Sequence, residues 1–196
     1  MLDRLFEYFS SEAARKEEFI HTKKLAVLIG NSLYSDIGDP DLEEVQEELD
    51  FVKTNLKTLL NFEDEEIHTL YEAKRIDTDK SLGKLKQEID EANEQDLHHL
   101  VFVYYVGRCA IDDGKFHTVH GADSSERKKH FAIEGWMKEL QGMGAFIVSL
   151  FDCYQMNDQK GWEWQMKNSL RLEKQCIMVA GWGKPAEIVS FKKRQS

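Results

Sequence analysis

Short apolar segments, separated by longer amphipathic ones, set the pattern of this chain. Three of them are rich in β-branched and aromatic residues and do not alternate between apolar and polar positions: Lys24–Gly30, Leu100–Tyr105 and Ala145–Phe151. Strands that are buried on both faces of a parallel sheet have this pattern. Ile67–Tyr71 and Cys176–Gly181 are interpreted as two further strands. The apolar segments therefore predict a mainly parallel sheet.

Amphipathic segments lie between these strands. In the clearest one, apolar residues recur at steps of three and four, a spacing that predicts a helix. They are Leu42, Val45, Leu49, Val52, Leu56 and Leu59. Its acidic run Glu43–Glu48 is interpreted as a solvated face. Similar spacing predicts helices over 82–92, 131–140 and 162–170. The alternation of strands and helices predicts the α/β class, in three α/β/α layers with helices on both faces of the sheet.

A small β-hairpin is predicted after the third strand. Ile111–Gly114 contains an Asp-Gly pair, which is a strong hairpin turn signal, and Lys115–Val119 is the expected returning strand. Three histidines lie in or near this region, His117, His120 and His130, without the spacing of metal ligands. We interpret them as surface or loop residues rather than as catalytic groups.

The chain divides into one domain with two short ends. Residues 1–23 are interpreted as an N-terminal helical extension, residues 24–191 as a single domain and residues 192–196 as a basic tail. A length of 196 residues is enough for one hydrophobic core and too short for two ordinary domains. The extension either packs on the flank of the domain or docks on a partner, and the sequence leaves both readings open.

Composition and charge narrow the classes of function. The chain is 41% hydrophobic and 32% charged, which is typical of a globular protein. A formal net charge of −10 argues against a nucleic-acid binder, because such a protein needs a basic face. No apolar run approaches the roughly 18 residues of a membrane span, and the N-terminus lacks the character of a signal peptide. We therefore expect no nucleic acid and no membrane as partners, and a cytoplasmic location.

The three cysteines, Cys109, Cys153 and Cys176, show neither a disulfide framework nor the spacing of a zinc site. A reducing compartment fits this usage best. We interpret Cys109 and Cys176 as small core residues. The sequence predicts no metal and no cofactor.

Five short motifs occur in an order that is typical of one protein family. They are Leu25–Tyr34 with a Gly-Asn-x-x-Tyr turn, the helical Asp50–Leu56, Tyr104–Ala110, the pair Asp113–Lys115 and Ala122–Asp123, and Leu150–Gln155. Together they resemble the caspase-like cysteine peptidases, the clan of caspases, metacaspases and paracaspases. The resemblance covers most of the chain and implies that residues 24–191 form a caspase-like domain.

In that family a thiolate attacks the substrate and a histidine activates it and protonates the leaving amine. Carried over residue by residue, the resemblance places Arg108 at the histidine position and Tyr154 at the cysteine position. Arginine cannot act as a base near pH 7, because its pKa is above about 12. A tyrosine hydroxyl, with a pKa of about 10, is a poor nucleophile without a base. The resemblance therefore implies a catalytically inactive pseudoenzyme that serves as a protein-interaction or structural subunit.

Asp152, two residues before Tyr154, has an expected role of its own. In metacaspases the residue equivalent to Asp152 helps to form a pocket for a basic substrate side chain. Because Arg108 lies on the adjacent strand, we expect the guanidinium and the Asp152 carboxylate to pair across the vestigial cleft, with Tyr154 supplying bulk. The expected partner is a protein, either a larger assembly, a caspase-like relative or a second copy that pairs with the sheet edge near Cys176–Phe191.

Two other functions stay open. The chain could be an active cysteine peptidase that uses Cys153, with His117 or His120 as a displaced base. Because adjacent strand residues point to opposite faces, Cys153 is expected to turn away from the rim at Arg108 if Tyr154 faces it. The chain could also be a regulator that binds an active caspase-like relative.

Overall fold

The computed structural model describes residues 22–35, 41–93, 98–112, 115–120, 130–155 and 176–183. Several predicted segments lie outside these residues: the first 21 residues of the N-terminal extension, the hairpin turn at 113–114, the motif Ala122–Asp123, the helix over 162–170, and residues 184–196, which include the end of the predicted domain and the basic tail. The description therefore covers the predicted strands, three of the predicted helices and the strand ends that carry the candidate site.

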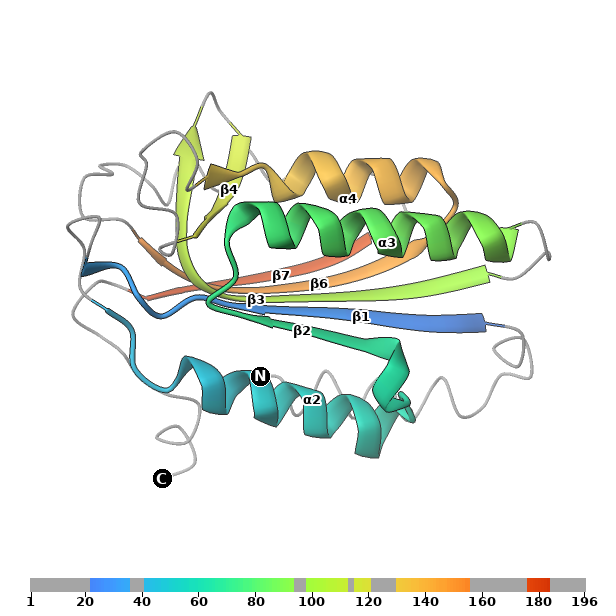
Figure 1. The fold of residues 1–196 in the computed structure, drawn as a ribbon, viewed down its shortest axis with the longest axis horizontal. Helices are drawn as coiled ribbons and strands as arrows, with labels where there is room; N and C mark the ends of the chain where they lie inside the picture. The colour runs from blue at the N-terminus through green and yellow to red at the C-terminus, as the bar shows by residue number, and fades with distance from the viewer. Residues whose placement is uncertain are drawn as a thin grey trace.

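A seven-stranded sheet runs through the middle of the molecule (Figure 1). Five of its strands are parallel, in the order β2-β1-β3-β6-β7. Their bounds are β1 Thr22–Gly30, β2 Ile67–Tyr71, β3 His98–Asp112, β6 Phe146–Gln155 and β7 Cys176–Gly183. The predicted α/β class with a mainly parallel sheet is confirmed.

The predicted hairpin after the third strand is also confirmed. Strand β3 continues past the parallel sheet, and β4 (Lys115–Val119) runs back along its last residues, with Cys109 opposite Thr118. A two-residue strand, β5 (His130–Phe131), pairs with β4 in the antiparallel direction. In Figure 1 this end of β3 curves away from the plane of the other strands. The hairpin therefore rises beside the carboxyl ends of β1 and β6.

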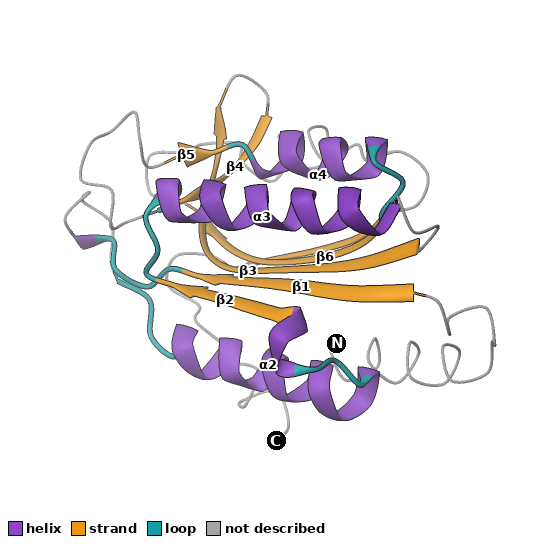
Figure 2. Cartoon of the chain, turned by 45° about the vertical axis from the view of Figure 1, so that its right-hand side comes forward, coloured by secondary structure: helices purple, strands orange, loops and turns teal. Residues whose placement is uncertain are grey.

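Helices cover both faces of the sheet (Figures 1 and 2). Helix α2 (Val45–Leu60) lies on one face, and α3 (Arg75–Asn93) and α4 (Ile133–Gly142) lie on the other. A 3-10 turn, η3 (Asp64–Glu66), leads into β2. Helix α3 begins seven residues before the first apolar position that predicted it, because its first turn is mostly exposed and carries no apolar stripe.

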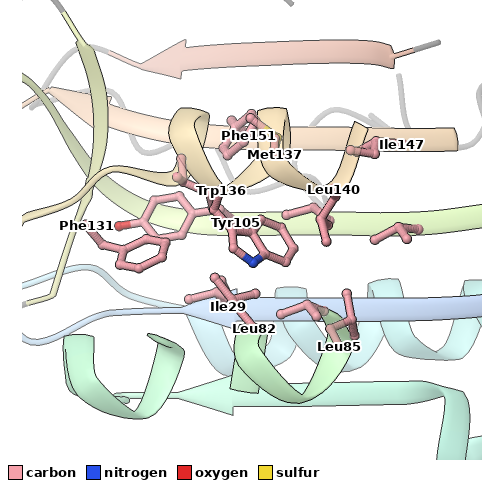
Figure 3. Close-up of a cluster of buried hydrophobic side chains, with 14 of the residues drawn as sticks. Ile29, Leu82, Leu85, Tyr105, Phe131, Trp136, Met137, Leu140, Ile147 and Phe151 are labelled. Carbon is pink, nitrogen blue, oxygen red and sulfur yellow. The ribbon is translucent and has the colours of Figure 1, made fainter. Parts of the chain in front are cut away.

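The core consists of two apolar clusters, one on each face. Figure 3 shows part of the cluster under α3 and α4, which includes Tyr105 and Phe151. The cluster under α2 includes Tyr104 and Leu150. Adjacent residues of one strand thus enter different clusters, because successive side chains point to opposite faces of a sheet. Both faces are apolar, which explains why these strands show no alternation in the sequence.

Candidate functional site

The carboxyl ends of β3 and β6 lie side by side. Their parallel pairing starts with Leu100 opposite Phe146 and continues without a shift, so that Val106 lies opposite Asp152 and Arg108 opposite Tyr154. The register thus brings the four positions that the sequence analysis singled out to the ends of two neighbouring strands. They are Arg108 on β3 and Asp152, Cys153 and Tyr154 on β6. In open α/β sheets, this is the edge at which functional sites are found.

The backbone bends at Gly107, one residue before Arg108. Gly107 has a φ of 153°, a conformation that residues with a side chain rarely adopt. A Cβ atom at this position would lie 2.6 Å from the hydroxyl oxygen of Tyr34 and 2.7 Å from that of Tyr105. Glycine is therefore required where β3 leaves the parallel sheet and enters the hairpin.

Two buried tyrosines hold the backbone just after this bend. The Tyr34 hydroxyl accepts a hydrogen bond from the Arg108 N–H at 2.8 Å. The Tyr105 hydroxyl donates to the Arg108 carbonyl at 2.6 Å and accepts from the N–H of Val119 at 3.2 Å. Burial raises the pKa of both hydroxyls, which keeps them protonated. The tyrosine pair therefore fixes Arg108 and joins it to the end of β4.

The Arg108 side chain is fully buried. Its guanidinium carbon lies 5.4 Å from the centre of the Tyr34 ring, within the range of a cation–π contact. A loop carboxylate, Asp41, accepts hydrogen bonds from the N–H groups of Tyr34 and Ser35 at 2.5 and 2.7 Å. These bonds lower the pKa of Asp41, and the charge of Arg108 adds a smaller effect in the same direction. Arg108 is thus buried, and its charge acts on the carboxylate of Asp41 in the loop before α2.

A carboxyl pair lies on the α2 side of the strand ends. The Tyr104 hydroxyl donates to the Glu48 carboxylate at 3.5 Å. Burial, and then the negative charge of Asp152, raise the pKa of Glu48 to about 8. The interpretation of Glu48 as part of a solvated face is wrong, since its carboxyl is partly buried between α2 and the sheet. The position of Glu48 between Val45 and Leu49, at the border of the apolar stripe, is the sequence signal that was available.

Replacement of Glu48 by Gln is expected to stabilise the protein at pH 8 and not at pH 4. The folded state holds a proton that the unfolded chain releases above its pKa of 4.5, so the stability of the wild type falls as pH rises from there to about 8. Removing this charge should raise the free energy of unfolding by about 1 to 3 kcal/mol at pH 8. Urea unfolding at the two pH values measures the difference. The control is Glu43→Gln, which removes an exposed carboxyl of the same segment. If Glu48→Gln raised the free energy of unfolding as much at pH 4 as at pH 8, the buried charge would not be the cause.

Cys153 lies on the opposite side of the sheet from this carboxyl pair. Its side chain is fully buried in the cluster under α3 and α4, and its sulfur lies 2.7 Å from that of Cys109. Burial raises the pKa of both thiols, so neither is an activated nucleophile. The expectation that Cys153 turns away from Arg108 is confirmed, and so is the core position of Cys109. The side chain of Cys176 lies outside the described ones.

The interpretation of His120 as a surface or loop residue is right about the loop and wrong about the surface, because the residue follows β4 but its side chain is fully buried. Its Nδ1 lies 3.0 Å from the Ala73 carbonyl oxygen, which can only accept. Its other ring nitrogen, Nε2, lies 3.3 Å from the Thr118 hydroxyl, within hydrogen-bonding distance. The hairpin folds back onto the loop after β2, a contact that no local pattern indicates. His117 is partly buried, and the side chain of His130 lies outside the described ones.

Within the described ranges, no three His, Cys, Asp or Glu side chains are placed to hold a metal ion. None of the helices in the same ranges is long and apolar enough to cross a bilayer. A comparison with protein-family models found no match to this chain, and a comparison with curated proteins found none either. Any assignment of function to this chain therefore depends on the sequence motifs and on the geometry of the strand ends.

Proposed function

We propose that this chain is a caspase-like pseudoenzyme that acts as a protein-interaction or structural subunit. One observation carries this proposal: a buried arginine, Arg108, lies in register with Tyr154 at the adjoining ends of β3 and β6. These are the positions at which the family resemblance would require a histidine and a cysteine. The parallel strand order, the helices on both faces and the hairpin after β3 support the caspase-like reading of the fold.

The chemistry of these two positions supports an inactive site. A guanidinium at this position, unlike an imidazole, can neither take a proton from a nucleophile nor give one to a leaving amine. The Arg108 backbone is held by Tyr34 and Tyr105, so the bend cannot readily present another group in its place. In a serine protease that uses a comparable nucleophile–base pair, loss of one member lowers kcat about a million-fold.

Three features count against a peptidase that uses Cys153 instead. The thiol is fully buried, burial raises its pKa, and its sulfur contacts Cys109 rather than an imidazole. Of the two candidate displaced bases, His117 and His120, the second has both ring nitrogens within hydrogen-bonding distance of other groups, one of Ala73 and one of Thr118. A working dyad needs the base within hydrogen-bonding reach of the nucleophile, with a free nitrogen to accept its proton.

The sheet edge supports a role in protein interaction. Strand β7 lies at one end of the described parallel sheet and pairs with β6. A strand at a sheet edge presents backbone groups with which another strand can pair. A protein partner, or a second copy of the chain, could add a strand there.

The purified chain is expected to cleave no peptide with Arg, Lys or Asp at the scissile position. A peptide bearing a thiol-reactive group should label the native chain no more than it labels Cys153→Ala, because Cys153 is buried. Fluorogenic cleavage assays and intact-mass spectrometry measure the two results, and the urea-unfolded chain, treated with iodoacetamide, is the positive control. Cleavage that disappears in Cys153→Ala and persists in Cys176→Ala would contradict the assignment.

Binding is tested by affinity capture from the native source with quantitative mass spectrometry, combined with light scattering of the purified chain. We expect either a retained protein in stoichiometric amount or a defined homodimer. An unrelated acidic protein of similar size, fixed to the same beads, controls for non-specific capture. A strictly monomeric chain that retains the same proteins as this control would contradict an interaction role.

A further inference from the structure

We propose that Cys109 and Cys153 form a reversible disulfide that ties β3 to β6 next to Arg108 and Tyr154. Each cysteine adjoins one of the two vestigial positions in the sequence, Cys109 after Arg108 and Cys153 before Tyr154. The inference does not depend on the proposed function, because a disulfide requires only that the two thiols lie close together. Both thiols lie on the face of the sheet opposite Glu48 and Asp152.

The two thiols are already placed for bond formation. Cys153 lies opposite Gly107 in the parallel register, and Cys109 is two residues further along β3, so the two side chains lie on the same face of neighbouring strands. Their sulfurs are 2.7 Å apart, against about 2.0 Å in a disulfide bond. Both side chains are fully buried in one apolar cluster, where a neutral disulfide is as well accommodated as two neutral thiols. A small shift of the side chains would close the bond.

Hydrogen peroxide is a sufficient oxidant. The thiolate of one cysteine attacks a peroxide oxygen, the O–O bond breaks, and a sulfenic acid and hydroxide form. The second sulfur, after losing its proton, attacks the sulfenic sulfur, so that the S–S bond forms and a second hydroxide leaves. The two thiol protons convert the two hydroxides to water. Two thiols and one peroxide thus yield one disulfide and two water molecules, and a dithiol reductant reverses the change.

The burial that protects these thiols also directs their reaction. Because burial raises the pKa of both thiols, the thiolate is scarce and the first step is slow. The second step has its partner sulfur in contact, so a sulfenic acid formed at either residue is captured before further oxidation. The bond would close a loop between residues 44 positions apart, which contains β4, β5 and α4. Oxidation would thus restrain the hairpin together with the strand ends.

The native wild-type chain treated with hydrogen peroxide provides the test. Free thiols are then blocked with iodoacetamide in urea, and the chain is digested with trypsin. Cleavage after Arg and Lys leaves the three cysteines on separate peptides, residues 109–115, 139–160 and 175–192. We expect the first two to appear joined, two hydrogen atoms lighter than their sum, and the third to appear alkylated. Alkylation of all three, oxidation of Cys109 or Cys153 to sulfinic acid, or joining through Cys176 would overturn the proposal.

Thermal unfolding of the wild-type chain supplies a second measurement, and two cysteine variants serve as its controls. The oxidised wild type should melt about 5 to 15 °C above the reduced chain, because closing the loop restricts the unfolded state. Dithiothreitol should remove this gain. Cys176→Ala should keep the redox-dependent shift and Cys153→Ala should lose it. An unchanged melting temperature after oxidation of the wild type would contradict a covalent tie between the strands.

Discussion

Gly107→Ala is expected to lower the free energy of unfolding by about 3 to 5 kcal/mol. Two costs add at this residue. The φ of 153° is unfavourable for any residue with a Cβ atom, and the new methyl group would overlap the hydroxyls of Tyr34 and Tyr105. Neither ring can withdraw without breaking a hydrogen bond to the backbone of Arg108. The strain therefore falls on the bend that carries the candidate site.

Urea unfolding followed by circular dichroism measures this loss. The matched control is Gly83→Ala in helix α3, where an added Cβ atom meets nothing within 4 Å. That change should stabilise the chain by about 0.5 to 1 kcal/mol, because alanine has the higher helix propensity. The two Gly-to-Ala changes are thus expected to have opposite signs. A Gly107→Ala chain within about 0.5 kcal/mol of the wild type, the range of a neutral surface change, would show that the tyrosine pair does not constrain the bend.

Arg108→Ala is expected to destabilise the chain by about 2 to 4 kcal/mol at pH 7. The change removes a large, fully buried side chain and its contact with the Tyr34 ring. It also removes the positive charge that helps to lower the pKa of Asp41. A lowered carboxyl pKa contributes stability above the unfolded value of 3.8, and this contribution is lost as pH falls through the folded value.

The dependence on pH separates charge from packing in this variant. The penalty of Arg108→Ala should shrink between pH 7 and pH 3, because Asp41 begins to take up a proton and its charge interaction with Arg108 weakens. Arg108→Met keeps much of the packing volume and should recover stability mainly at low pH. Arg75→Ala, an exposed arginine at the start of α3, is the control and should change stability by less than about 0.5 kcal/mol. A penalty that is the same at both pH values would indicate packing alone.

A stable but inactive site is consistent with these expectations. A catalytic dyad needs a base that exchanges protons and a nucleophile open to substrate. The strand ends instead hold the Arg108 guanidinium against an aromatic ring, with two protonated tyrosine hydroxyls bonded to the Arg108 backbone. In the proposed pseudoenzyme these groups would hold the strand ends in place rather than carry out chemistry.

The sequence by itself determined the elements of this protein and the places where the candidate site would lie. Unbroken apolar segments such as Leu100–Tyr105 predicted buried parallel strands, and the Asp-Gly turn predicted the hairpin. The motifs placed Arg108 and Tyr154 at the ends of two strands, and the register pairs them. These features depend on local periodicity and on strand order, which neighbouring residues encode.

Only the tertiary structure decided which side chains from distant segments meet. The contact of Glu48 on α2 with Tyr104 on β3, the burial of His120 and the 2.7 Å approach of Cys109 to Cys153 join residues far apart in the chain. Periodicity shows which face of an element is buried, but not what is packed against it. Desolvation, charge and hydrogen bonding at a site arise from that packing, and so do its pKa values and its chemistry.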